Sequence, residues 1–277
     1  MNAEELSRLY DFRNKAAVVT GGAGVLCGEI ACCLAELGAR VAILDLAPER
    51  VDPWRPRLDG AESEYRVLPC DVLRPDSIEA AAAEVRGAFG SVDILINGAG
   101  GNHPKATTSE QIPFFDIPPE AMRFVFELNL LGTILPSQAF GRVMAEQGEG
   151  IILNISSMNA FRPLTRIAAY SAAKAGVSNF TQWLAVHMAT QYSPRIRVNA
   201  VAPGFFLTEQ NRFLLTDEKT GALTPRGQAI LSHTPAGRFG HPRDLLGAVL
   251  FLLSPAAEFV TGVVLPIDGG YQAFGGI

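Results

Sequence analysis

Short apolar runs alternate with longer segments of helical periodicity along the whole chain. The apolar runs are rich in Val, Ile and Ala, which is typical of buried strands. They predict strands at 16–20, 41–44, 65–69, 93–96, 151–155, 196–201 and 263–267. The intervening segments predict helices at 26–37, 77–89, 120–146, 170–192 and 242–253. This alternation predicts an α/β fold in which a parallel sheet is covered by helices on both faces.

Some segments depart from the alternation. After the second predicted strand the chain carries prolines at 48, 53 and 56, which predict a short helix or an irregular turn. Pro136 lies inside the 120–146 segment and is expected to kink that helix. Residues 101–119 are expected to form an extended polar loop. Residues 205–240 lack a strong period, which predicts a substrate lid.

Composition and charge narrow the classes of function. Of 277 residues, 48% are hydrophobic and 18% are charged, which suits a packed core and argues against disorder. A net charge of −5 without a Lys/Arg cluster disfavours nucleic acid and membrane surfaces as partners. No segment resembles a signal peptide or is long enough to span a bilayer. We therefore expect one cytoplasmic domain covering residues 1–277.

A glycine-rich turn follows the first predicted strand, in the sequence TGGAGVLCGEIA at 20–31. Glycines let the backbone approach a pyrophosphate, and the helix start offers free N–H groups. Alone, such a turn is also a plain strand-to-helix connection. An acid about twenty residues later, Asp45, favours a dinucleotide site because its carboxylate can accept from both adenosine ribose hydroxyls. Leu46 follows and the turn holds no Lys or Arg, which favours NAD over NADP.

The four cysteines lack metal-ligand or redox spacing, so no metal site is expected. Cys32 and Cys33 are adjacent in an apolar helical pattern, which is typical of small core residues. Cys27 differs from them because it lies in the glycine-rich turn.

Three polar side chains surround the fifth predicted strand and the helix after it. Ser157 follows the strand, and Tyr170 and Lys174 are four residues apart at the helix start. Residues at that spacing share one helical face. Alone, Tyr-x-x-x-Lys is more often an ordinary surface pair. Combined with Ser157 and the glycine-rich turn, it predicts that a hydroxyl, a phenol and an ammonium converge.

Together these motifs resemble the short-chain dehydrogenase/reductase family. The resemblance is carried by the glycine-rich turn, Asp71-Val72, Asn97-Gly98-Ala99-Gly100, Asn129, Ser157, Tyr170, Lys174 and Pro203-Gly204. The family implies one Rossmann-type doubly wound domain of seven parallel strands, a homotetramer and NAD-dependent oxidation of CH–OH groups. Its usual glycine pattern is Thr-Gly-x-x-x-Gly-x-Gly. Here Val25 and Cys27 occupy the second and third glycine places, and Gly24 and Gly28 are one position off.

The resemblance also implies roles for single residues. Tyr170 would be the general acid/base, with a pKa lowered by Lys174, and Ser157 would orient the reacting oxygen. Asn129 would hold a water in a proton relay, with a helix-kink role as its alternative. For Asp71, which would accept from the adenine, a turn role is the alternative. The expected cofactor contacts are Gly21, Gly22, Gly24, Val25, Leu26, Asp45, Asp71, Val72, Asn97, Gly98, Ala99, Tyr170, Lys174, Pro203 and Gly204.

The resemblance is nearer to one branch, the bacterial D-mannonate oxidoreductases (fructuronate reductases), through 96–108, 156–175 and 202–215. That branch implies NAD(H)-dependent interconversion of D-mannonate and D-fructuronate. A sugar acid needs polar and cationic partners, and those expected are Asn102, His103, Lys105, Ser157, Asn159, Arg162 and Arg166. A turn role fits Asn159 equally well. The alternative functions are a dehydrogenase of another aldonate or polyol, such as gluconate at C5, and an NAD-sensing protein without catalysis.

Overall fold

A seven-stranded parallel sheet forms the centre of the computed structural model, which describes residues 2–208, 212, 215–217 and 220–276. The strand order is β3-β2-β1-β4-β5-β6-β7. The strands are β1 (Ala16–Thr20), β2 (Arg40–Asp45), β3 (Tyr65–Pro69), β4 (Ile94–Asn97), β5 (Gly150–Ile155), β6 (Ile196–Pro203) and β7 (Val264–Ile267). The predicted α/β fold and its strands are confirmed. Strand order reverses between β1 and β4, which is where open α/β sheets bind ligands.

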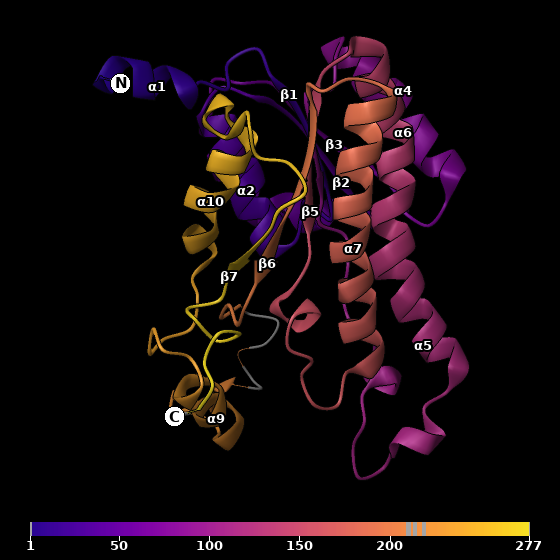
Figure 1. Ribbon diagram of the computed structural model, residues 1–277, viewed down its shortest axis with the longest axis vertical. Coiled ribbons are helices and arrows are strands. Elements are labelled where there is room, and N and C mark those ends of the chain that lie inside the picture. The colour runs from indigo at the N-terminus through magenta and orange to yellow at the C-terminus, as the bar shows by residue number, and fades with distance from the viewer. Residues whose placement is uncertain (1, 209–211, 213–214, 218–219, 277) are drawn as a thin grey trace.

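Helices cover both faces of the sheet (Figure 1). On one face lie α2 (Val25–Glu36) and α10 (Leu246–Leu253). On the other lie α4 (Pro75–Phe89), α6 (Gly132–Gln147) and α7 (Ala168–Gln191), as both ribbon views show. Each side has its own cluster of buried apolar residues. The two layers therefore stabilise the sheet from opposite sides, as the alternating pattern predicts.

The first strand shows how the sequence divides between these two cores. Ala17 and Val19 belong to the cluster under α2, whereas Ala16 and Val18 belong to the cluster under α4, α6 and α7. Consecutive side chains of a strand point to opposite faces. A strand buried on both sides is therefore apolar throughout, which explains why the predicted strands are continuous apolar runs.

The proline-rich connection forms a 3₁₀ segment, Pro48–Trp54, followed by the short helix α3 (Arg55–Gly60). This agrees with the predicted short helix or irregular turn. Pro56 lies in the first turn of α3, where its missing N–H needs no partner. The chain thereby delivers Trp54 to the outer side of α2, where its indole packs against Gly28.

The long helix is interrupted before Pro136. α5 (Pro119–Phe126) ends in a π-helical turn at Glu127–Leu131, and α6 then continues through Pro136. Within this turn the Asn129 Nδ2 donates to the Val125 carbonyl four residues earlier, at 2.8 Å. A side chain that takes this carbonyl competes with the helical ladder. The kink at Pro136 stays a prediction.

The carboxyl ends of the strands, the start of α7, α9 (Pro225–Ser232) and the C-terminal residues lie at one end of the molecule (Figure 1). The opposite end carries α1 (Ala3–Leu9). Of the predicted lid at 205–240, residues 209–211, 213–214 and 218–219 lie outside the described residues. In the part of the chain that is described, no helix is both long enough and apolar enough to cross a membrane.

Candidate active site

Ser157, Tyr170 and Lys174 lie together where β5 ends and α7 begins. The Lys174 Nζ is 5.8 Å from the centroid of the Tyr170 ring. The same Nζ donates to the Ile155 carbonyl at 2.7 Å, which ties the helix to the strand end. The Ser157 hydroxyl lies near enough to the Tyr170 phenol to lower its pKa. The three groups that the sequence predicts to converge thus face one another at the carboxyl edge of the sheet.

Burial controls the charges of this group. It raises the pKa of the Tyr170 phenol, and the nearby Ser157 hydroxyl offsets only part of that increase. Burial also lowers the pKa of Lys174 to about 8, against a smaller opposite influence of the Cys27 thiol. At pH 7 the protein alone therefore holds a neutral phenol beside a mostly protonated ammonium. A phenolate requires additional positive charge nearby, which is the charge that oxidised nicotinamide carries.

Asn129 pins the chain that follows β4. Its Nδ2 donates to the Gly101 carbonyl at 2.7 Å, and its Oδ1 accepts from the Gly101 N–H at 3.1 Å. A Cβ placed on Gly100 would lie 2.8 Å from that Oδ1 and 3.3 Å from the Lys174 Nζ. The amide and the ammonium therefore flank Gly100. The proton relay and the kink alternative for Asn129 both stay predictions.

A buried polar network holds the ends of β4 and β5 in register. The Asn97 Nδ2 donates to Ser137 Oγ at 2.9 Å and to Asn154 Oδ1 at 2.8 Å. The Asn154 amide in turn donates to Thr181 Oγ1 on α7 at 2.9 Å. These bonds place the middle of α7 against the strand ends. They also direct the Asn97 side chain into the sheet, so only its backbone stays available for a ligand.

The glycine-rich turn leaves an open cradle at the start of α2. Gly21 has a φ of +62°, and a Cβ there would lie 2.8 Å from the Ala99 backbone. Gly24 is the N-cap of α2 without a side-chain cap, and the first turn, which includes Val25 and Leu26, carries no acid. Free N–H groups and a positive helix end suit a pyrophosphate. Thr20 Oγ1 completes the cradle by accepting from the N–H groups of Gly98 and Ala99, at 3.1 and 3.3 Å.

Asp45 ends β2 beside this cradle. Its carboxylate accepts from the N–H of Ala23 at 3.2 Å and from that of Ala47 at 3.1 Å, so its position is fixed. Leu46 next to it is 74% exposed and brings no positive charge for a 2′-phosphate. The carboxylate and the neutral loop fit the adenosine ribose and pyrophosphate of NAD.

The other expected cofactor residues lie along the same edge. Asp71 Oδ1 accepts from the Leu73 N–H at 2.9 Å, which is the turn role considered as its alternative. Val72 is buried against the Gly132 region at the start of α6. Pro203 ends β6, and Gly204 approaches Asp268 so closely that a Cβ would lie 2.5 Å from that residue's Cβ.

Trp54 at the cradle was not identified from the sequence, and neither was the packing of Cys27. Trp54 donates its indole N–H to the Ala23 carbonyl at 3.3 Å, and a Cβ on Gly28 would lie 2.3 Å from the indole ring. The Cys27 Sγ occupies the space beside Gly98, 2.1 Å from where a Cβ would lie. The glycine inside the predicted helix, Gly28, was the available signal because such a residue often permits a close neighbour.

The expected substrate residues divide between two adjacent loops. The Thr108 N–H donates to the Arg166 carbonyl at 2.8 Å, which joins the 101–118 loop to the loop after β5. Arg166 has a φ of +76°. Arg162 donates instead to the Phe274 carbonyl of the C-terminal segment. Asn159 is buried, and its side chain is engaged within its own loop.

The remaining candidates lie in the first of these loops. The His103 ring meets the Phe124 ring edge-on at 5.4 Å, and its Nδ1 accepts from the Lys105 N–H at 3.1 Å. The side chains of Asn102 and Lys105 are exposed, and Asn102 donates to Thr107 Oγ1 at 2.8 Å. Across the described residues, no group of three His, Cys, Asp or Glu side chains could hold a metal ion.

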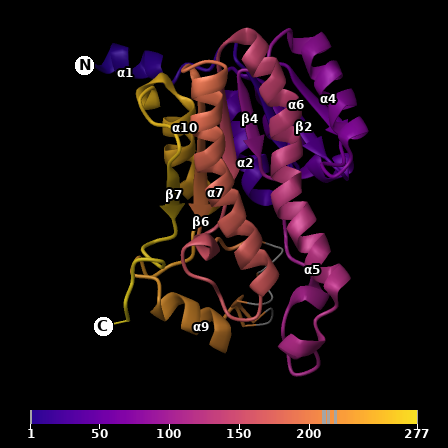
Figure 2. The same ribbon diagram turned by 45° about the vertical axis from the view of Figure 1, so that its right-hand side comes forward.

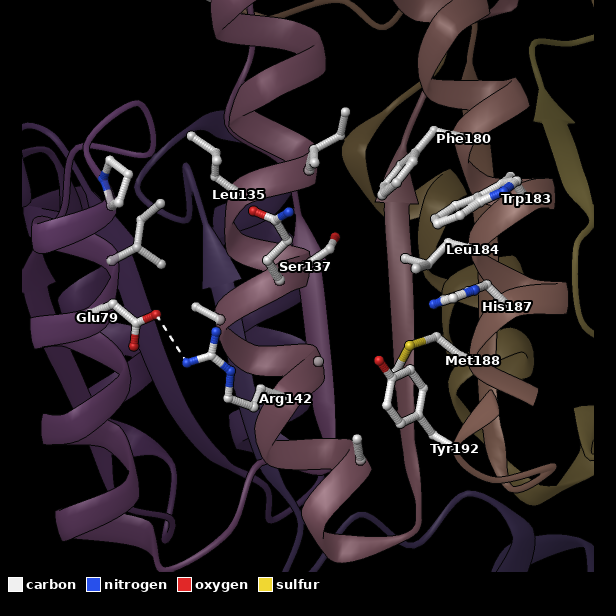
Figure 3. A pocket seen from close by; sticks show the side chains of 17 residues that line it. Glu79, Leu135, Ser137, Arg142, Phe180, Trp183, Leu184, His187, Met188 and Tyr192 are labelled. Atoms are coloured by element: carbon white, nitrogen blue, oxygen red, sulfur yellow. Dashed lines mark ion pairs between the residues drawn. The ribbon is translucent and has the colours of Figure 1, made fainter. Parts of the chain in front are cut away.

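A groove of roughly 630 Å³ lies away from this chemistry, on the outer side of α4, α6 and α7. Figure 3 shows Phe180, Trp183 and His187 of α7, and Tyr192 just beyond its end, on the side of the groove opposite α6. The Trp183 and His187 rings stack at 4.7 Å between centroids. The groove is a surface feature of the helical layer and is separate from the candidate active site.

Comparisons with known proteins agree with this geometry. A family model described as enoyl-(acyl carrier protein) reductase, of the short-chain alcohol dehydrogenase type, matches residues 24–272. A Haemophilus influenzae protein solved with bound NAD, whose assignment as a D-mannonate oxidoreductase is provisional, is 44% identical. It superimposes with a TM-score of 0.89 over 96% of this chain and 98% of that one.

Two curated relatives extend the comparison. An uncharacterized oxidoreductase of Bacillus subtilis, UxuB, is 44% identical over 95% of this chain and 96% of its own. D-threitol dehydrogenase of Mycolicibacterium smegmatis is 36% identical over 97% of this chain and 98% of its own. With the parallel sheet, the cradle and the Ser-Tyr-Lys group already in place, these matches establish that the chain is an NAD-dependent oxidoreductase of the short-chain dehydrogenase/reductase family.

Proposed function

We propose that this oxidoreductase interconverts a sugar-acid alcohol and its ketone, D-mannonate and D-fructuronate, at Tyr170. The observation that carries the site is the meeting of Ser157, Tyr170 and Lys174 beside a glycine cradle and the Asp45 carboxylate. The support for the substrate is the sequence resemblance and the provisional name of the NAD-bound relative. The four cysteines are all free, which fits a reducing cytoplasm.

Tyr170 is the proton donor and acceptor of the proposed reaction. Bound NAD supplies the hydride acceptor or donor and, in its oxidised form, a positive charge. In ketone reduction the phenol donates its proton to the carbonyl oxygen, and in alcohol oxidation the phenolate removes the hydroxyl proton. Lys174 stabilises the phenolate because its ammonium faces the ring at 5.8 Å. Ser157 donates to the reacting oxygen and aligns it with the phenol.

Asp45 makes the enzyme selective for NAD in this proposal. Its carboxylate, held by two backbone N–H groups, accepts from the ribose hydroxyls and repels a 2′-phosphate. For the substrate carboxylate we propose Arg166 and Lys105, which lie on loops that a backbone hydrogen bond joins. Arg162 becomes available only if its bond to the Phe274 carbonyl opens.

The test is oxidation of NADH and NADPH with D-fructuronate, beside 5-ketogluconate, D-erythrulose and simple cyclic ketones. Rapid turnover with D-fructuronate and NADH, and at least about 100-fold less with NADPH, would support substrate and cofactor choice together. Turnover with another ketone only would retain the mechanism and discard D-fructuronate. Tight NADH binding without turnover of any ketone would favour an NAD-sensing protein.

A dehydrogenase of another polyol or aldonate is the second candidate. The 36% identity to D-threitol dehydrogenase over nearly the whole chain favours it, since that relative acts on an uncharged polyol. The two candidates differ in their need for a cationic partner. Arg166→Met should raise the KM for a sugar acid at least about tenfold and leave the KM for a polyol unchanged, because only the former loses an ion pair.

We also propose a homotetramer, with one contact between copies made by the outer face of α7. On that face Trp183, Val186 and Tyr192 are 56%, 65% and 58% exposed, beside the groove of Figure 3. Exposed apolar groups of this kind at the rim of a groove are typical of association surfaces. Light scattering should show a larger species for the parent and a smaller one for Val186→Glu. A monomeric parent would refute the proposal.

A further inference from the structure

We propose that Asn159 is a positioning residue, which directs the Ser157 hydroxyl proton toward the Tyr170 phenol and the reacting oxygen of the substrate. The observation is a pair of hydrogen bonds onto one atom. The Asn159 backbone N–H and its side-chain Nδ2 both donate to the Ser157 Oγ, each at 3.2 Å. This inference rests on the proposed roles of Ser157 and Tyr170, and it assigns Asn159 to the catalytic machinery rather than to the substrate.

A serine hydroxyl has one proton to donate and two lone pairs that accept. Asn159 fills both acceptor positions, so the oxygen can only donate toward its remaining side. Among the described residues that proton has no acceptor, and the hydroxyl lies near enough to the Tyr170 phenol to lower its pKa. The proton is therefore held ready for the reacting oxygen that Tyr170 serves. A donor held in advance toward an oxygen that gains negative charge needs no reorganisation during the reaction.

The orientation of the Asn159 amide is fixed as well. Its Oδ1 accepts from the Leu164 N–H at 3.2 Å. A backbone N–H can bond only the oxygen end of an amide, so Nδ2 must face Ser157. Asn159 is 7% exposed, which leaves little room for water to replace either bond. Both ends of the side chain are thus engaged, which supports a positioning role for Asn159.

The charges around Tyr170 decide how a change at Asn159 is measured. The Lys174 ammonium faces the phenol from α7 itself, and the Cys27 thiol of α2 interacts with that ammonium. The Ser157 hydroxyl, from the loop after β5, lowers the pKa of the phenol. If Asn159 controls the direction of that hydroxyl, replacing its donor must shift the titration of Tyr170. A residue that only stabilises the loop would leave the titration unchanged.

Two substitutions of nearly the same size separate these roles. Asn159→Asp keeps the acceptor for the Leu164 N–H but turns the group facing Ser157 into an acceptor, which reverses the serine hydroxyl. Asn159→Leu removes both polar ends while the backbone N–H still holds Ser157. If Asn159 has a positioning role, kcat of Asn159→Asp should be lower than that of Asn159→Leu by about tenfold or more. If its role is purely structural, Asn159→Leu should have the lower kcat, because it also loses the hydrogen bond from the Leu164 N–H.

The experiment measures kcat, KM for both substrates and the pH profile of these variants, each also combined with Ser157→Ala. We expect Asn159→Asp to lower kcat about 10- to 100-fold and to raise the apparent pKa by about one unit, with the NADH dissociation constant unchanged. In the Ser157→Ala background the same change should lower kcat less than about threefold. An equal loss in both backgrounds, or Leu as damaging as Asp with an unchanged profile, would overturn the proposal.

A spectroscopic titration separates this inference from the proposed substrate. The Tyr170 phenolate is followed by its ultraviolet absorbance in the NAD⁺-loaded protein, with Tyr170→Phe as the blank. A parent that reduces none of the ketones would count against the proposed function alone. A Tyr170 titration that does not move in Asn159→Asp would count against the positioning role, whatever the substrate is.

Discussion

Replacing the buried Lys174 by methionine should make the cofactor-free protein more stable at neutral pH while it removes turnover. The Lys174 side chain is almost fully buried, and the hydrogen bond from its Nζ goes to the Ile155 carbonyl. Burial lowers its pKa from 10.5 to about 8. The ammonium is therefore held at a site that disfavours its charge, and a methionine of similar shape removes that charge.

The size of the effect follows from the shift. Removing a charge whose pKa is lowered by about 2.5 units stabilises the folded protein by roughly 3 kcal/mol. Losing the hydrogen bond to the Ile155 carbonyl destabilises it by about 1 kcal/mol. Lys174→Met should therefore stabilise the protein by about 2 kcal/mol at pH 7. Below pH 8 both folded and unfolded chains carry the proton, so the whole penalty is present. Between pH 8 and 10.5 Lys174 stays protonated only in the unfolded chain, so the stability of the parent rises with pH.

Urea unfolding of the cofactor-free parent and variant between pH 6 and 9.5 measures this difference. The gap in unfolding free energy should be largest at pH 6 to 7 and should shrink by roughly 1.4 kcal/mol per pH unit above pH 8. Lys105→Met, at an exposed lysine, is the matched control and should show no such gap. A Lys174→Met protein less stable than the parent at pH 7, or a gap that does not change with pH, would refute the reasoning.

Three further predictions concern the active site and the cradle. Tyr170→Phe should lower kcat at least about 100-fold and leave the NADH dissociation constant unchanged; a variant as active as the parent in steady-state assays would contradict the acid/base role. Gly98→Ala should destabilise the protein by about 1–3 kcal/mol in thermal unfolding, because its Cβ would lie 2.1 Å from the Cys27 Sγ. Adding Cys27→Ala should recover only part of this, since the Thr20 carbonyl also lies 2.9 Å away; no recovery would exclude the sulfur as the cause. Trp54→Phe should raise the KM for NADH several-fold with kcat unchanged, because Ala23 loses its indole partner, whereas a change in kcat alone would speak against this.

Features set by local patterns were predicted well from the sequence. The strands were found because a strand buried on both faces must be apolar throughout. Tyr170 and Lys174 were placed correctly because a spacing of four fixes the face of a helix. The fold followed from the regular alternation of these elements. None of these inferences needed a contact between distant parts of the chain.

What the sequence did not predict depends on which partner a side chain takes. The π-helical turn could not be located because the residue types do not show that the Asn129 amide bonds the Val125 carbonyl and the Gly101 backbone. Pro136 was the visible irregularity, yet α6 continues through it. Asn159 was open to two readings because the use of an amide depends on which groups lie at its two ends. For Asn129, and for the oxygen end of Asn159, the partner is a backbone group, which leaves no trace in the residue types.

The departure from the usual glycine pattern is explained by space rather than by the number of glycines. Cys27 stands where the family has glycine, and its Sγ takes the room that Gly98 leaves on the neighbouring turn. Gly28 lies one position later and makes the room that the Trp54 indole fills. Each bulky side chain is thus matched by a glycine on the facing element. The indole also donates to the Ala23 carbonyl, while the Ala23 N–H donates to Asp45. Both backbone groups of Ala23 are therefore hydrogen-bonded, which fixes this part of the cradle. Because the two pairs are complementary in volume, enlarging one member is less destabilising when its partner becomes smaller.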